Sequence, residues 1–66
     1  MITINISRRI DPNNVYAEGT MTSTADLEEL SDFARTHELQ HGSAFYCQED
    51  GEIYQINPDY SYKKMV

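Results

Sequence analysis

His37, His41 and Cys47 are the residues of this 66-residue chain whose types and spacing could bind a metal ion. Two histidines four residues apart share one face of a helix, as a pair of zinc ligands requires, and Cys47 could supply a third ligand. Gly42, however, is expected to end the helix, which leaves His41 at or beyond its last turn. Histidines near a helix C-terminus are also favoured by the helix dipole alone. We therefore predict no metal site and no cofactor.

The sequence does not predict an enzyme. Cys47 is the only cysteine, and nothing around it resembles the setting of an activated nucleophile, so a buried apolar cysteine explains it. Carboxylates are plentiful, but acid–base catalysis needs two of them in one cleft. A chain of 7.6 kDa leaves little room for a cleft of ~300 Å³.

Acidic side chains dominate the charge of the chain. Eleven Asp and Glu stand against five Lys and Arg, which gives a net charge of −6. Such a surface repels phosphate backbones and anionic lipids, so we expect no direct binding to nucleic acid or membranes.

Most of the carboxylates lie in the middle of the chain, and several are three or four residues apart on a predicted helix, where they repel one another. A solvated acidic face is the ordinary explanation of this arrangement, and electrostatic complementarity to a basic partner protein is the functional hypothesis. The predicted partner-binding carboxylates are Asp26, Glu28, Glu29, Asp32, Glu49, Asp50 and Glu52.

Tyrosine is the second candidate feature of the binding surface, because its ring is rigid and its hydroxyl remains solvated. Tyr16, Tyr46 and Tyr60 are predicted to contact the partner, and Tyr62 and Ile53 are also expected outside the core. Ordinary cross-strand packing on an open sheet face is the alternative.

Residues 24–39 have the periodicity of an amphipathic helix. Apolar positions recur at spacings of three and four along one stripe. Ser23 is the predicted N-cap, Asp26 completes a capping box, and Gly42 supplies the left-handed residue after the helix.

Alternating apolar and polar residues predict strands near 2–8, 15–22, 43–49 and 52–57. The first two form an antiparallel hairpin with a loose turn at 11–14. A two-residue turn at Asp50-Gly51 would pair the last two strands. This register places Cys47 opposite Tyr54 and Phe45 opposite Ile56.

Residues 1–66 are therefore predicted to form one α+β domain with the order β-β-α-β-β. A small antiparallel sheet of about four strands carries one amphipathic helix on one face, and residues 58–66 form a tail. The expected core is Ile2, Ile4, Ile6, Val15, Ala17, Met21, Leu27, Leu30, Phe33, Ala34, Phe45, Cys47, Tyr54 and Ile56.

The expected location is the cytoplasm. No apolar run approaches the roughly 20 residues that cross a bilayer, and no signal-peptide pattern is visible at the N-terminus. A lone cysteine also fits a reducing compartment.

In size, charge and layout the chain is similar to phage or mobile-element inhibitors of bacterial defence nucleases and CRISPR complexes. This likeness implies a non-enzymatic protein that occupies the basic nucleic-acid-binding surface of another protein in the host cytoplasm. The alternative is a homodimeric structural or regulatory module. Its open sheet face, or its edge strand at residues 2–6, would pair with a second copy.

Overall fold

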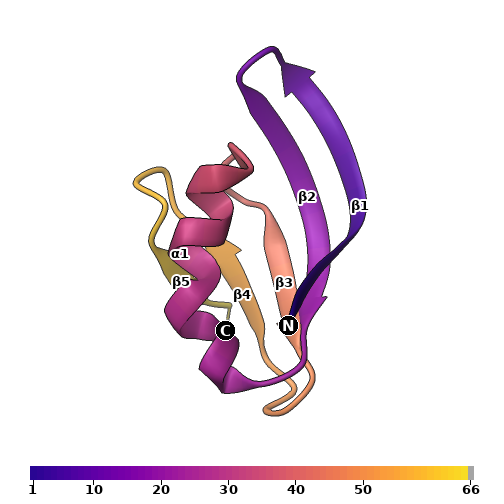
Figure 1. The fold of residues 1–66 in the computed structure, drawn as a ribbon, viewed down its shortest axis with the longest axis vertical. Coiled ribbons are helices and arrows are strands. Elements are labelled where there is room, and N and C mark those ends of the chain that lie inside the picture. The colour runs from indigo at the N-terminus through magenta and orange to yellow at the C-terminus, as the bar shows by residue number, and fades with distance from the viewer. Residues whose placement is uncertain (66) are drawn as a thin grey trace.

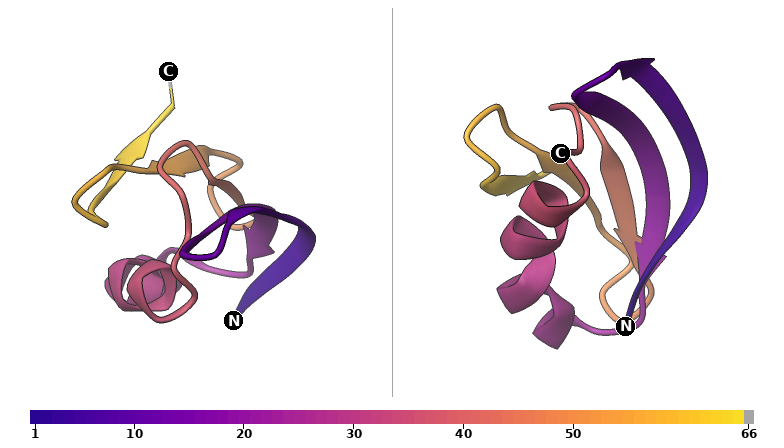
Figure 2. Two further views of the ribbon diagram at one scale, coloured as in Figure 1. Left: turned by 90° about the horizontal axis from the view of Figure 1, so that it is seen from above. Right: turned by 45° about the horizontal axis from the view of Figure 1, so that its top comes forward.

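A computed structural model describes residues 1–65, which form a five-stranded sheet with one α-helix against one of its faces (Figure 1). The elements in chain order are β1 (Ile2–Asp11), β2 (Asn14–Met21), the 3-10 turn η1 (Thr24–Asp26), α1 (Leu27–Thr36), β3 (Ala44–Cys47), β4 (Ile53–Ile56) and β5 (Tyr62–Lys64). The sheet order is β1-β2-β3-β4-β5, and the sheet curves around the helix (Figure 2). The predicted α+β class, with its helix on one face, is confirmed.

Two details of the sheet differ from the prediction. β2 and β3 run parallel, because α1 carries the chain back along the sheet between them. The other strand pairs are antiparallel. Part of the segment expected to be a tail forms β5, which pairs with β4. Val66, the last residue of that predicted tail, lies outside the described residues.

The β1–β2 hairpin forms as predicted, but it contains an irregularity that changes which side chains are buried. The register shifts by one residue between Ile4 and Ile6. Ile6 consequently lies opposite Glu18, on the face of the sheet that points away from the helix, and it is 58% exposed. The prediction that Ile6 belongs to the core is wrong for this reason.

The start of the helix follows the sequence signal. The Ser23 hydroxyl accepts a hydrogen bond from the backbone N–H of Ala25 at 3.2 Å, and the Asp26 carboxylate accepts one from the Ser23 N–H at 3.2 Å. These two contacts are the predicted capping box.

The end of the helix differs from the prediction, because α1 stops at Thr36 and Glu38 has the left-handed conformation expected at Gly42. The Glu38 N–H donates to the Arg35 carbonyl and the Leu39 N–H donates to the Ala34 carbonyl, the hydrogen bonds of a Schellman motif. Leu39 is thereby buried at 2% exposure, although the helical periodicity does not place it in the core.

The β3–β4 connection is longer than the predicted two-residue turn. Phe45 pairs with Tyr54, which shifts the expected register by two residues. The Asp50 carboxylate accepts hydrogen bonds from the Glu52 N–H at 2.9 Å and the Tyr54 hydroxyl at 2.6 Å, so the loop closes around this side chain. A shift by two residues preserves the facing of every side chain, and the predicted burial of these strands is correct.

The core lies between α1 and the sheet. It consists of Ala17, Met21, Leu30, Ala34, Leu39, Phe45, Cys47, Tyr54 and Ile56. Apart from Ile6, the remaining predicted core residues are only half-buried and pack around this core together with Tyr60. They are Ile2, Ile4, Val15, Leu27 and Phe33. Within residues 1–65, no helix is long and apolar enough to cross a membrane.

Candidate protein-binding surfaces

Asp26, which the sequence predicts to contact a partner, is buried and only 8% exposed. Its Oδ2 atom lies 2.6 Å from the α-amino nitrogen of Met1 and 3.2 Å from the backbone nitrogens of Thr22 and Ser23. The hydrogen bond from the Met1 ammonium group is the main reason that the pKa of Asp26 lies below its ordinary value. Asp26 therefore holds the N-terminus against the start of the helix and offers little charge to a partner.

Glu49 is held by the same end of the helix. Its carboxylate accepts hydrogen bonds from the Thr24 backbone N–H at 2.7 Å and the Thr24 hydroxyl at 2.9 Å. These contacts lower the pKa of Glu49 and fasten the β3–β4 loop to η1. No local sequence pattern predicts this role, because the two residues are 25 positions apart.

The Asp50 carboxylate is engaged in hydrogen bonds within the β3–β4 loop and with Tyr54. The hydrogen bond from the Tyr54 hydroxyl lowers the pKa of Asp50 and raises the pKa of Tyr54 to about 12. Glu52, in the same loop, is partly exposed. Two of the three predicted binding carboxylates in this loop, Glu49 and Asp50, therefore form hydrogen bonds within the fold.

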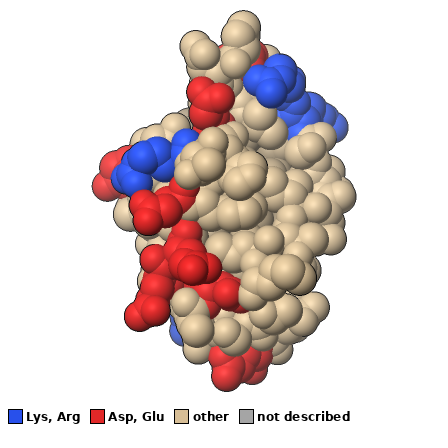
Figure 3. All heavy atoms as spheres, in the orientation of Figure 1, with Lys and Arg blue, Asp and Glu red and all other residues tan. Residues whose placement is uncertain are grey.

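Glu28, Glu29 and Asp32 are exposed on α1, and we call this set the acidic helix surface. Within residues 1–65, neither glutamate forms an ion pair. Asp32 lies 3.0 Å from Arg35, but both side chains are more than half exposed, so water competes with the pair. Figure 3 shows Asp and Glu atoms gathered over the helix, with Lys and Arg atoms at the β1–β2 end of the molecule and also beside the upper end of the helix.

An open groove of about 320 Å³ lies beside the acidic helix surface, lined by Glu29, Asp32, Phe33, Thr36 and His37. The rings of Phe33 and His37 stack with centroids 4.1 Å apart, and the His37 Nδ1 atom lies 2.9 Å from the Phe33 carbonyl oxygen. The groove thus combines carboxylates with an aromatic wall. Lys and Arg side chains match this combination, because they have apolar stems and charged ends.

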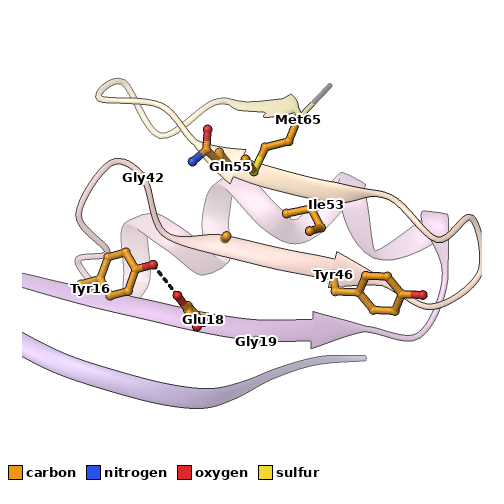
Figure 4. A pocket seen from close by; sticks show the side chains of 9 residues that line it. Tyr16, Glu18, Gly19, Gly42, Tyr46, Ile53, Gln55 and Met65 are labelled. Carbon is orange, nitrogen blue, oxygen red and sulfur yellow. Dashed lines mark hydrogen bonds between the residues drawn. The ribbon is translucent and has the colours of Figure 1, made fainter.

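Tyr16 and Tyr46 lie on the opposite side of the molecule, on the sheet face that α1 does not cover (Figure 4). We call this the open sheet face. It holds a groove of about 380 Å³, lined by Tyr16, Glu18, Gly19, Gly42, Ala44, Tyr46, Ile53, Gln55 and Met65. The Tyr16 hydroxyl donates to the Glu18 carboxylate at 2.6 Å, which raises the pKa of Tyr16.

Tyr60 and Tyr62 do not share this face with Tyr16 and Tyr46. Tyr60 packs against the core, and the guanidinium carbon of Arg35 lies 5.6 Å from the centroid of its ring. Tyr62 makes an edge-on contact with the buried ring of Tyr54, at 5.9 Å between centroids. The predicted tyrosines therefore divide between two sides of the molecule.

His37, His41 and Cys47 are not brought together. His37 caps the end of α1, His41 lies in the following turn, and Cys47 is fully buried in β3. In the described part of the chain, no three or more His, Cys, Asp or Glu residues lie together in a group that could hold a metal ion.

No protein-family model, curated protein or solved structure matches this chain.

Proposed function

We propose that this protein binds a basic partner protein through the acidic helix surface. The observation that carries the proposal is the exposure of Glu28 and Glu29, neither of which has an ion-pair partner within residues 1–65. Asp32 lies three residues after Glu29 and four after Glu28, so its carboxylate repels both of theirs, even though the two glutamates in the first turn of α1 favour the positive end of the helix dipole. A complementary positive surface would relieve the repulsion.

The partner that fits best is a protein whose Lys and Arg side chains are arranged to bind nucleic acid. An acidic protein seated on such a surface excludes the nucleic acid sterically and by charge. We propose the role of a non-enzymatic inhibitor, encoded by a phage or mobile element, that blocks a bacterial defence complex of the CRISPR or restriction type in the host cytoplasm. The small size and net charge of −6 support this role.

The proposed contact is smaller than the sequence alone predicts. Asp26, Glu49 and Asp50 are engaged within the fold, and Tyr60 is half-buried against the core. The groove beside Phe33 adds an apolar element to the acidic helix surface, where the stem of a basic side chain can pack.

A DNA-binding competition tests the proposal. Purified CRISPR effector and restriction complexes are given fluorescent target DNA, and their binding is followed by anisotropy while this protein is added. We expect one complex to lose DNA binding. Reversing two charges, as Glu29→Lys with Asp32→Lys, should weaken the inhibition by at least about tenfold while the protein remains folded.

Asn13→Lys is the control, because it adds a positive charge at an exposed site in the turn between β1 and β2. It should inhibit like the unmodified chain. Equal inhibition by the double variant and the unmodified chain would refute the role of the acidic helix surface. Undiminished DNA binding across the whole set of complexes would refute the inhibitor role.

A further inference from the structure

The open sheet face has an unusual composition for a surface exposed to water. The strand registers place the following side chains on it: Ile6, Arg8, Tyr16, Glu18, Thr20, Ala44, Tyr46, Ile53, Gln55, Lys63 and Met65. Ile6, Tyr46, Ile53 and Met65 are each more than 40% exposed. The outward face of a solvated sheet normally carries polar residues, so the exposed apolar side chains on β1, β3, β4 and directly after β5 indicate an interface.

The charges on this face indicate what kind of surface would cover it. Glu18 lies on β2, with Arg8 on the neighbouring strand β1 and Lys63 on the distant edge strand β5. The open sheet face thus carries both signs of charge, unlike the acidic helix surface. Arg8 and Lys63 would repel a basic partner. In an interface with a twofold axis, the same patch of each copy faces the other. A patch that carries both signs of charge can therefore pair its acidic side chains with the basic side chains of the second copy.

We propose that the open sheet face is the interface of a symmetric homodimer, in which two copies pack sheet against sheet. Tyr16, Tyr46, Ile53 and Met65 lie at its centre, around the groove of about 380 Å³ that a side chain of the second copy can enter (Figure 4). Each α1 then faces outward. The two acidic helix surfaces are kept apart, which limits repulsion between chains that each carry −6.

Pairing through the free edge of β1 is the competing mode of association. Two register shifts interrupt β1, between Ile4 and Ile6 and between Arg9 and Asp11. Irregularities and charged side chains at an edge strand both oppose edge-to-edge pairing. The edge of β1 is therefore poorly suited to a second copy, whereas the open sheet face has no such protection.

Sedimentation velocity over a range of protein concentrations tests the proposal. We expect the unmodified chain to sediment as a dimer, with twice the monomer mass of 7.6 kDa. Ile53→Asp, at the centre of the open sheet face, should weaken the dimer by at least about thirtyfold. Met65→Asp provides a second test at a residue near the end of the chain, where a charge cannot disturb the core.

Ser7→Asp is the matched control, because Ser7 is exposed on β1, its pairing with the buried Ala17 places it on the other face of the sheet, and the substitution introduces the same charge. It should remain dimeric. A monomer at every concentration, or a dimer that survives both Ile53→Asp and Met65→Asp, would overturn the proposal. Dissociation caused by Ser7→Asp would instead assign the contact to the β1 edge. None of these outcomes alters the DNA-binding competition, so the two proposals can fail separately.

Discussion

The negative charge of Asp26 is not available to a partner, because its carboxylate is paired within the fold. Its position three residues after Ser23 predicts a capping box, and that contact is present. The ion pair with the Met1 ammonium group is not visible in the sequence, because it depends on β1 bringing the N-terminus beside the helix. Local hydrogen bonds could be predicted, but the remaining contacts of the same side chain could not.

Acid should destabilise the fold through such carboxylates. In residues 1–65, hydrogen bonds lower the pKa of five of them: Asp11, Asp26, Glu49, Asp50 and Asp59. Because each pKa is depressed in the folded state, the stability that it provides is present above the ordinary values of 3.8 and 4.5 and is lost as the pH falls through the folded pKa. We expect a nearly constant melting temperature down to about pH 5 and a steep fall below about pH 4.

The Asp26→Asn variant isolates one part of this effect. It should melt at a lower temperature at neutral pH, because the asparagine amide does not carry the charge that pairs with Met1. Its melting temperature should also fall less steeply in acid, which circular dichroism can measure. An unchanged acid profile would show that Asp26 does not contribute to the acid sensitivity.

Ser43 is a second residue whose role depends on distant segments. It is fully buried, its hydroxyl accepts a hydrogen bond from the Ala17 N–H at 3.1 Å, and it donates one to the Gln40 carbonyl at 2.7 Å. Ser43→Ala leaves a buried N–H without a partner and should cost about 1–3 kcal/mol of unfolding free energy in urea titrations. Ser31→Ala, on the partly exposed part of α1, should change it by less than about 0.5 kcal/mol.

At the scale of elements, side-chain facing could be predicted from alternation, but register could not. Phe45 and Tyr54 are buried as expected even though their pairing differs by two residues. Facing depends on whether a position is odd or even, and a two-residue shift preserves it. Ile6 fails the same test because a shift of one residue reverses the facing of a strand.

The end of α1 gives a prediction about backbone strain. Glu38 has a φ of 55°, a conformation that costs a non-glycine residue roughly 1–2 kcal/mol. Glu38→Gly should therefore raise the unfolding free energy by up to about 1 kcal/mol, after the larger entropy loss of glycine is subtracted. Gly42→Ala should have the opposite sign: no atom crowds this site, but its φ is 92°. Chemical denaturation of both variants checks this contrast, and equal effects would contradict it.

At the scale of the whole molecule, the sequence contains enough information for the α+β class but less for the sheet topology. The helix between β2 and β3 joins neighbouring strands of one sheet, and such a crossover requires them to be parallel. The sequence predicts that the carboxylates and tyrosines form one binding surface, whereas the sheet separates them. The acidic helix surface lies on one side, and Tyr16 and Tyr46 lie on the other.

We propose that the negative charge available to a partner is concentrated on α1, and NMR can test this without knowledge of the partner. A short oligolysine peptide is titrated into isotope-labelled protein, and backbone amide shifts are followed. We predict that the largest shifts occur at Glu28, Glu29 and Asp32, and that they vanish at high salt. Shifts of equal size at Asp11 and Asp59, or an absence of shifts along α1, would contradict the account.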